Sequence, residues 1–172
     1  SRDVRVLDWT LQAVKFLNPE VHFIAGYQID EIVSRYPDLN FTINSKWKKT
    51  GPIVSLLEAK VPDNSHCIVS YSDILFRERT VKDLINLDAD ISIAVDSSWK
   101  ERYSSRTPED MDCSEKIIIS EDKLLNSSTN ISTENANAEF IGLLTLKPNV
   151  MRFLREKSEL FPSDMFRANL TY

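Results

Sequence analysis

The chain has 172 residues, of which 42% are hydrophobic and 27% charged, which suffices for one globular domain with its own core. Its 26 acidic and 21 basic residues give a net charge of −5, and a surface of that sign does not neutralise the phosphates of duplex DNA. No apolar run approaches the roughly 20 residues needed to cross a bilayer. The two cysteines lie far apart and have no CxxC spacing. We therefore expect a cytoplasmic protein that binds neither nucleic acid nor membrane.

The first part of the chain alternates helical and strand patterns. Apolar residues recur at helical spacing from Leu7 to Leu17, and Asn18-Pro19 ends that pattern because the residue before proline avoids helical angles. Pro52 stands at the favoured first position of a later helix. In chain order we expect a strand over 21–25, a helix over 30–36, a strand over 39–43 and a helix over 51–60.

The alternation continues and then changes. A strand over 67–71, a helix over 80–87 and a strand over 91–95 follow, which favours a mostly parallel sheet covered by helices on both faces. After a polar stretch over 97–113, we expect a hairpin of strands 116–119 and 123–125, a strand over 140–146, a helix over 148–159 and a further helix capped by Ser163. The sequence thus predicts a single domain, 1–172, of the three-layer α/β class. Its sheet would be mostly parallel and Rossmann-like, with an antiparallel hairpin excursion.

Asp73 is the first candidate site residue. It follows an apolar strand in Tyr71-Ser72-Asp73-Ile74, and ligands of open parallel sheets bind outside the carboxyl ends of the strands. A carboxylate there can hold Mg²⁺, which prefers one or two protein carboxylates plus substrate phosphates. Aspartate is also common as a helix cap or turn residue, so the local sequence alone favours a structural role.

Thr50, Gly51 and Ser55 form the second candidate, at the turn that opens the helix over 51–60. A glycine lets a ligand approach the backbone closely, and free N–H groups follow it. A simple loop-to-helix junction explains the same residues equally well. Two sets of basic and aromatic residues could neutralise or stack on a ligand but more often belong to solvated loops: Lys46, Trp47, Lys48 and Lys49, and Arg102, Tyr103 and Arg106.

The order of these signals resembles nucleoside-triphosphate transferase domains. Asn44-x-x-Trp47-x-x-Thr50-Gly51 looks like their base-recognition loop, and Ser72-Asp73-Ile74-Leu75-Phe76 looks like the strand end that binds the catalytic metal. Two segments, 90–96 and 138–143, continue the likeness over nearly the whole chain. It is closest to phosphocholine and 2-aminoethylphosphonate cytidylyltransferases and to the transferase domain fused to phosphoenolpyruvate mutase.

This resemblance implies a nucleotide-diphospho-sugar transferase type of fold and a Mg²⁺-dependent nucleotidyltransferase. Such an enzyme takes a nucleoside triphosphate, with CTP favoured, and a small phosphorylated or phosphonylated acceptor. Asp73 would be the catalytic metal ligand, and Thr50, Gly51 and Ser55 would contact the base or ribose. The acceptor pocket would contain Asp96, Glu139 and Lys116, with the two carboxylates pairing to an ammonium group of the acceptor.

The sequence departs from the family at its start, where the Gly-rich loop that holds the triphosphate is absent, and the family's C-terminal end is absent too. We interpret the sequence as part of a longer enzyme, for which a homodimer stays an option. The alternatives are a non-catalytic nucleotide-binding or assembly domain, and a sugar-1-phosphate nucleotidyltransferase. A glycosyltransferase is disfavoured because Asp73 is followed by Ile74 and Leu75 instead of an Asp-x-Asp metal motif, and because Asp88-Ala89-Asp90, which has that spacing, precedes a strand.

Overall fold

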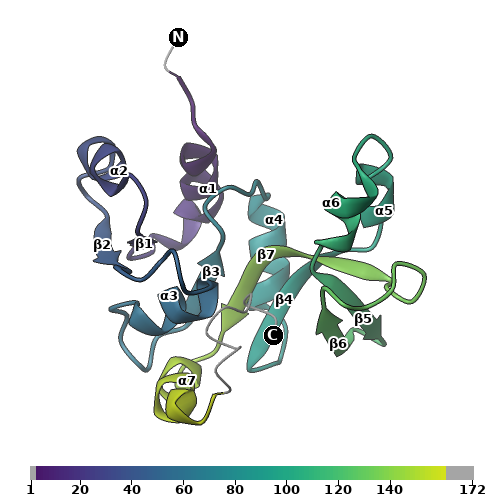
Figure 1. Cartoon of the computed structure of the whole chain (residues 1–172). Helices are drawn as coiled ribbons and strands as arrows, with labels where there is room; N and C mark the ends of the chain where they lie inside the picture. The colour runs from purple at the N-terminus through teal and green to yellow at the C-terminus, as the bar shows by residue number, and fades with distance from the viewer. Residues whose placement is uncertain (1–2, 162–172) are drawn as a thin grey trace.

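The computed structural model describes residues 3–161, and its strands form two sheets (Figure 1). In the smaller sheet, β1 (His22–Ala25) pairs in parallel with β2 (Asn40–Ile43). The larger sheet has five strands: β3 (Cys67–Ser70), β4 (Ile91–Asp96), β5 (Lys116–Ser120), β6 (Lys123–Ser128) and β7 (Ala138–Leu146). Within residues 3–161, no further strand pairs with the second edge of β1 or of β3.

β7 organises the larger sheet, because β4 pairs along one of its edges while β3 and then β5 pair along the other. All of these pairings are antiparallel, and so is the β5–β6 hairpin. The α/β class and the antiparallel hairpin excursion are confirmed. The pairing is more antiparallel than the sequence predicts, because β7 lies between β3 and β4, which run in the same direction without pairing to each other.

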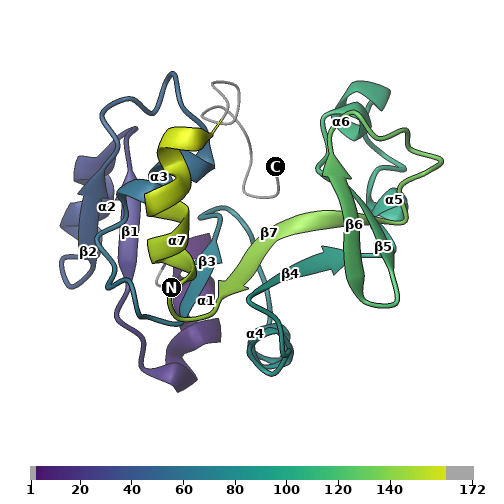
Figure 2. The ribbon, with the colours of Figure 1, turned by 90° about the horizontal axis from the view of Figure 1, so that it is seen from below.

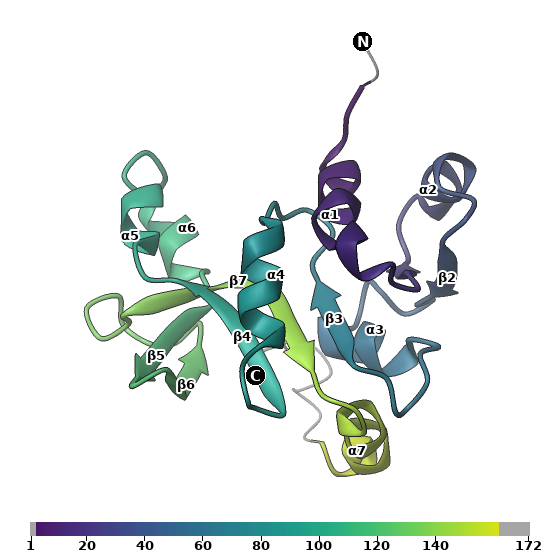
Figure 3. The ribbon, with the colours of Figure 1, turned by 180° about the vertical axis from the view of Figure 1, so that it is seen from behind.

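Helices cover both faces of this arrangement. α1 (Val6–Val14), which continues as a 3₁₀ helix over Lys15–Leu17, packs on α4 (Glu78–Ile85), and α4 packs on β4 and β7. α3 (Pro52–Glu58) packs on β1 and on α7 (Val150–Lys157), which ends in a second 3₁₀ turn at Ser158–Leu160. α2 (Ile29–Arg35) connects β1 to β2. Figures 2 and 3 show α4 crossing beside β4 and β7, and α7 lying next to α3.

The core confirms the three layers, because successive residues of β7 enter different hydrophobic clusters, as expected when side chains alternate across a strand. Leu144 and Leu146 join the cluster that contains Leu56 of α3 and Met151 of α7. Leu143, which is fully buried, joins Val81 and Leu84 of α4 on the opposite face. β7 is therefore fixed from both sides.

The polar stretch over 97–113 is more ordered than the sequence predicts. It contains α5 (Trp99–Arg102) and α6 (Pro108–Asp112). The ring of Trp99 is 1% exposed and meets that of Tyr103 edge-on, with centroids 5.8 Å apart. These aromatics pack with Ala136, far along the chain, so the burial of the two rings could not be predicted from a local periodicity. The helix expected at Ser163 lies outside the described residues.

Candidate functional site

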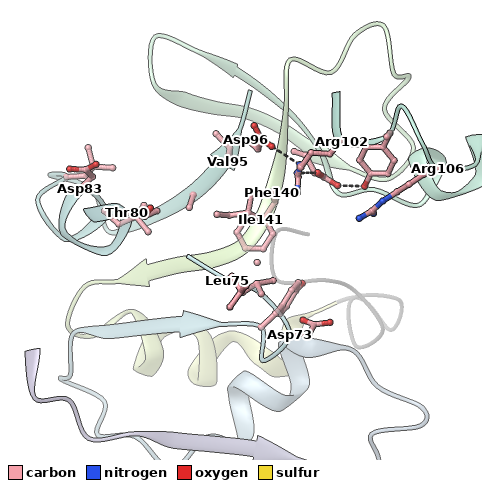
Figure 4. Close-up of a pocket in the computed structure, with 18 residues that line it drawn as sticks. Asp73, Leu75, Thr80, Asp83, Val95, Asp96, Arg102, Arg106, Phe140 and Ile141 are labelled. Carbon is pink, nitrogen blue, oxygen red and sulfur yellow. Dashed lines mark hydrogen bonds and ion pairs between the residues drawn. The ribbon is translucent and has the colours of Figure 1, made fainter. Parts of the chain in front are cut away.

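A cavity of about 960 Å³ lies where the carboxyl ends of β3 and β4 meet the amino end of β7 (Figure 4). Because β3 and β4 run in the same direction, the residues that follow them reach the same edge of the sheet. Asp73 follows β3, Asp96 ends β4, and Glu139 stands near the start of β7; all three line the cavity. The structure thus brings together three carboxylates that the sequence named separately.

Gly142 shapes the apolar wall of this cavity. Its φ of +84° lies in the left-handed region, and the pairing of β4 with β7 shifts register between Ile93 and Val95, opposite this point. The ring of Tyr71 packs so closely on Gly142 that an added Cβ would stand 2.5 Å from the Tyr71 Cδ2 atom. Bulges of this kind bend a strand and often adjoin active sites. Here the bend leaves Phe140 and Ile141 as part of the cavity wall.

Asp73 lies on one side of the cavity, apart from Asp96 and Arg102 (Figure 4). It is exposed, and Ile74 and Leu75 beside it also line the wall. Among residues 3–161, no group of three or more His, Cys, Asp or Glu side chains is placed to hold a metal ion. A metal at Asp73 would therefore need most of its ligands from water and substrate.

Arg102 joins Asp96 to Glu139. Its Nε atom lies 2.8 Å from Oδ2 of Asp96, and its Nη2 atom donates a hydrogen bond to Oε2 of Glu139. The second oxygen of Asp96 accepts a hydrogen bond of 2.8 Å from the backbone N–H of Ser98. The guanidinium group thus occupies the position between the two carboxylates, where the sequence led us to expect an acceptor's ammonium group.

Tyr103 completes the surroundings of Glu139, which is only 8% exposed. Its hydroxyl donates a hydrogen bond of 2.5 Å to Oε1 of Glu139. Burial of the phenol, followed by its hydrogen bond to the Glu139 carboxylate and the charge of that group, raises the pKa of Tyr103 to about 12. Tyr103 therefore keeps its proton at neutral pH and holds Glu139 in one orientation.

Arg106 lies at the same end of the cavity. Its guanidinium carbon is 5.1 Å from the centroid of the Tyr103 ring, and its backbone N–H donates to the Tyr103 carbonyl over 3.0 Å. Within the described part of the chain, its guanidinium forms no ion pair. Arg106 is exposed and lines the cavity.

Lys116 is placed differently from Asp96 and Glu139, although it pairs with Glu139 in the β5–β7 register. It is 1% exposed and is not among the residues that line the cavity. Its ammonium group donates to the backbone carbonyls of Asp112 (2.7 Å) and Thr129 (2.8 Å). These bonds tie α6 and the segment after β6 to β5, so that the visible role of Lys116 is structural, and its contact with an acceptor stays a prediction.

The predicted base-binding residues gather around Asn44, which is 1% exposed. The side-chain amide of Asn44 donates to the hydroxyls of Thr50 (3.0 Å) and Ser55 (3.1 Å), and its Oδ1 accepts from the backbone N–H of Lys46. Gly51 directly precedes α3, between these two hydroxyls in sequence. None of the three predicted base-binding residues lines the cavity that contains Asp73, so a nucleotide shared between them stays a prediction.

Trp47 packs beside this loop and covers Gly26. A Cβ on Gly26 would stand 2.4 Å from the Trp47 ring, so that only glycine fits there. The ring centroids of Trp47 and Tyr27 are 5.5 Å apart, and Nζ of Lys48 is 5.4 Å from the Trp47 centroid. The tryptophan therefore fixes the loop to the end of β1.

The sequence placed Asn44 in the base-recognition motif without a role of its own, and it left Arg102, Tyr103 and Arg106 open between contact with a ligand and a solvated loop. The signal for Asn44 was its place in the same motif as Thr50 and Gly51. For the other three, the signal was the concentration of aromatic residues around them, since large rings such as those of Trp99 and Tyr103 are usually buried and are uncommon in a solvated loop. Glu139, the partner of Arg102 and Tyr103, lies 37 and 36 positions away from them, which no local pattern shows.

Comparison with known proteins gives one curated relative and several structural neighbours. The CTP:phosphoglutamine cytidylyltransferase of Campylobacter jejuni is 25% identical over 182 residues, which cover 99% of this chain and 72% of that protein. No family model matches the chain.

Among solved structures, the inositol-1-phosphate CTP transferase of T. maritima superposes with a TM-score of 0.68 at 15% identity. It covers 96% of this chain, which spans 65% of that protein's length. A Bacillus anthracis protein assigned as a glucose-1-phosphate thymidylyltransferase gives a TM-score of 0.66 at 15% identity. The superposition covers 96% of this chain and 67% of the Bacillus anthracis protein. No helix within residues 3–161 has the length and apolar character needed to cross a membrane.

At 15% identity the two structural likenesses concern the fold. The chain therefore has the fold of the nucleotide-diphospho-sugar transferases and is related along its length to a cytidylyltransferase.

Proposed function

We propose that the protein is a nucleotidyltransferase that transfers CMP from CTP to a small phosphate or phosphonate compound and releases pyrophosphate. The observation that carries this proposal is the cavity in which Asp73 stands opposite the cluster of Asp96, Arg102 and Glu139. Relationship to a cytidylyltransferase over 99% of the chain supports CTP as the nucleotide.

The reaction needs positioning and charge neutralisation more than covalent catalysis. An oxygen of the acceptor's phosphate or phosphonate forms a new bond to the α-phosphorus of CTP. The bond from that phosphorus to the oxygen bridging to the β-phosphorus breaks, and its electron pair leaves with pyrophosphate. An acceptor whose far end lies beside Arg102 would have its phosphate directed across the cavity toward Asp73, because these residues lie on different sides (Figure 4).

Mg²⁺ is the metal that fits this site best. Asp73 is a single exposed carboxylate on a cavity wall, and Mg²⁺ is held in such sites by one or two carboxylates together with water and substrate phosphates. A metal that requires a protein cage of three or more side chains does not suit the described residues. When bound, Mg²⁺ would neutralise charge on the triphosphate. Asp73 would fix the position of that charge relative to the acceptor.

The base or ribose of the nucleotide would contact Thr50, Gly51 and Ser55. Asn44 is their positioning residue, because its amide group holds both hydroxyls within hydrogen-bond distance. Thr50 also donates its own proton to the carbonyl of Lys46 at 3.1 Å. The Thr50 hydroxyl therefore has one oxygen lone pair left for a ligand, and the Ser55 hydroxyl is held beside it by the same amide.

A pyrophosphate-release assay over a panel of triphosphates and acceptors tests the proposal. We expect release that requires both CTP and an acceptor, that depends on Mg²⁺, and that falls when UTP, ATP or GTP replaces CTP. Binding of CTP without pyrophosphate release for any phosphate or phosphonate acceptor would contradict an enzymatic role and favour the non-catalytic alternative. Cytoplasmic location and a homodimer are further proposals, the second of which sedimentation analysis of the purified protein would test.

A further inference from the structure

The acceptor end of the cavity contains two carboxylates and two guanidinium groups: Asp96, Glu139, Arg102 and Arg106. The carboxylates are already supplied with donors. Each of their four oxygens accepts one hydrogen bond or ion-pair contact, from Arg102, from the Tyr103 hydroxyl or from the N–H of Ser98. Arg102 neutralises one of the two negative charges and occupies the position between the carboxylates that an ammonium group of a ligand would otherwise take.

Arg106 is in the opposite situation. It lines the same cavity, it is exposed, and its guanidinium contacts the face of the Tyr103 ring, while no carboxylate of the described residues pairs with it. A guanidinium stacked on an aromatic ring is restrained in orientation and presents its N–H groups sideways as a planar fork. That fork matches the two oxygens of a carboxylate or phosphate.

We infer that the acceptor of this enzyme has a second anionic group, a carboxylate or a phosphate, at the end away from the reacting phosphorus, and that Arg106 binds it. This inference rests on the proposed function and specifies its substrate class. It replaces the cationic acceptor end that the sequence suggested, because Arg102 already fills the place between Asp96 and Glu139. Arg106 would thus be a specificity-determining residue.

The test compares phosphonates of similar length that differ at the far end. 2-Aminoethylphosphonate ends in an ammonium group, propylphosphonate in a methyl group, 3-phosphonopropionate in a carboxylate, and propane-1,3-bisphosphonate in a second phosphonate. Their binding is measured by calorimetry with Mg²⁺ and a CTP analogue whose α–β bridge is a methylene group, so that no turnover occurs. We expect at least one of the two probes with a second anionic group to bind about tenfold more tightly than 2-aminoethylphosphonate and propylphosphonate. The tighter of these two probes identifies the anionic group.

The variant Arg106→Gln keeps a polar side chain of similar length and should reduce this preference to within about threefold, while Arg106→Lys should retain part of it. Arg152→Gln is the matched control, since Arg152 is an exposed residue of α7 that forms an ion pair with Glu156 one turn away and does not line the cavity, and it should leave the preference unchanged. The inference is overturned if neither 3-phosphonopropionate nor propane-1,3-bisphosphonate binds, if 2-aminoethylphosphonate binds as tightly as the better of these two, or if Arg106→Gln keeps the full preference.

Pyrophosphate release from CTP, measured with the same four probes, separates the two claims. An Arg106-dependent preference in binding without any pyrophosphate release would contradict the proposed function and leave the inference about the site standing. Pyrophosphate release that is fastest with 2-aminoethylphosphonate would support the proposed function and overturn the inference.

Discussion

The hydroxyl of Tyr103 donates a hydrogen bond of 2.5 Å to Oε1 of Glu139 inside the acceptor end of the cavity. Both residues are 8% exposed, and a buried carboxylate is costly unless donors surround it. Arg102 supplies the second donor. The tyrosine therefore links the small aromatic core around Trp99 to the site, and stability and site geometry depend on the same contact.

This contact predicts a pH dependence of stability. The Tyr103 phenol has a pKa of about 12 in the folded protein, against 10.0 for an unperturbed tyrosine. Between these values the folded state keeps a proton that the unfolded state has lost, so the free energy of unfolding falls as pH rises from about 10 to about 12. At neutral pH the contribution is fully present. For Tyr103→Phe this part of the pH dependence is absent.

Urea unfolding of both proteins at pH 9 and pH 11 measures the effect. The stability advantage of the unsubstituted protein over Tyr103→Phe should shrink by about 1 kcal/mol between the two pH values, since one unit of pKa corresponds to 1.36 kcal/mol. Tyr36, whose pKa is also raised, through burial and its hydrogen bond to Asp8, is common to both proteins and cancels in the comparison. An advantage that stays constant with pH would show that the Tyr103 proton is not held by Glu139.

Gly142 carries a second prediction, because its φ of +84° and the Tyr71 ring both exclude a Cβ. Gly142→Ala should lower the free energy of unfolding by about 2–4 kcal/mol, from backbone strain together with overpacking. The double variant with Tyr71→Ala separates the two causes. If the ring contact matters, the cost of Gly142→Ala will be smaller in the Tyr71→Ala background, and equal costs in both backgrounds would leave backbone strain as the only cause.

The sequence predicted the ends of strands better than the neighbours of strands. Asp73 and Asp96 were placed at strand ends from local runs of apolar residues, and both line the cavity. The position of β7 could not be obtained in this way, because alternation gives the direction of a strand but not its neighbours. The contact of Arg102 with Asp96 and Glu139 was not predictable for a related reason, since α5 has four residues and is held by packing instead of helical periodicity. Long-range packing thus determines the part of the site that recognises the acceptor.

Asn44 carries a third prediction, as the residue that positions the predicted base-binding loop. Asn44→Ala removes two donors to Thr50 and Ser55 and one acceptor for Lys46. We expect the free energy of unfolding to fall by about 1–3 kcal/mol, because the amide is buried. Under the proposed function, KM for CTP should rise by about tenfold, with little change in KM for the acceptor.

Asn40→Ala is the matched control for Asn44→Ala, because Asn40 is exposed and its amide donates to the side chain of Glu20, which is exposed too. Melting curves and initial rates at varied CTP concentration give both quantities. A rise in KM for the acceptor alone would place the Asn44 loop at the acceptor instead of the nucleotide.

The last prediction concerns Asp73. Asp73→Asn keeps the shape of the side chain but removes the charge that would position Mg²⁺ beside the triphosphate. A lost metal contact of several kcal/mol lowers turnover by roughly two to four powers of ten, since each 1.36 kcal/mol is about tenfold. The melting temperature should change little, because Asp73 is exposed in the folded protein. Pyrophosphate release and thermal melting are measured on the same preparation.

Asp122→Asn is the control for this substitution, because Asp122 is an exposed residue of the β5–β6 turn with φ of +60°, which asparagine also adopts readily. It should retain normal turnover. If Asp73 were only a turn residue, the result would be reversed: Asp73→Asn would weaken folding while turnover per folded molecule stayed near normal. Near-normal turnover of Asp73→Asn with saturating Mg²⁺ would remove Asp73 from the reaction centre, and the metal would then have to be held by other residues.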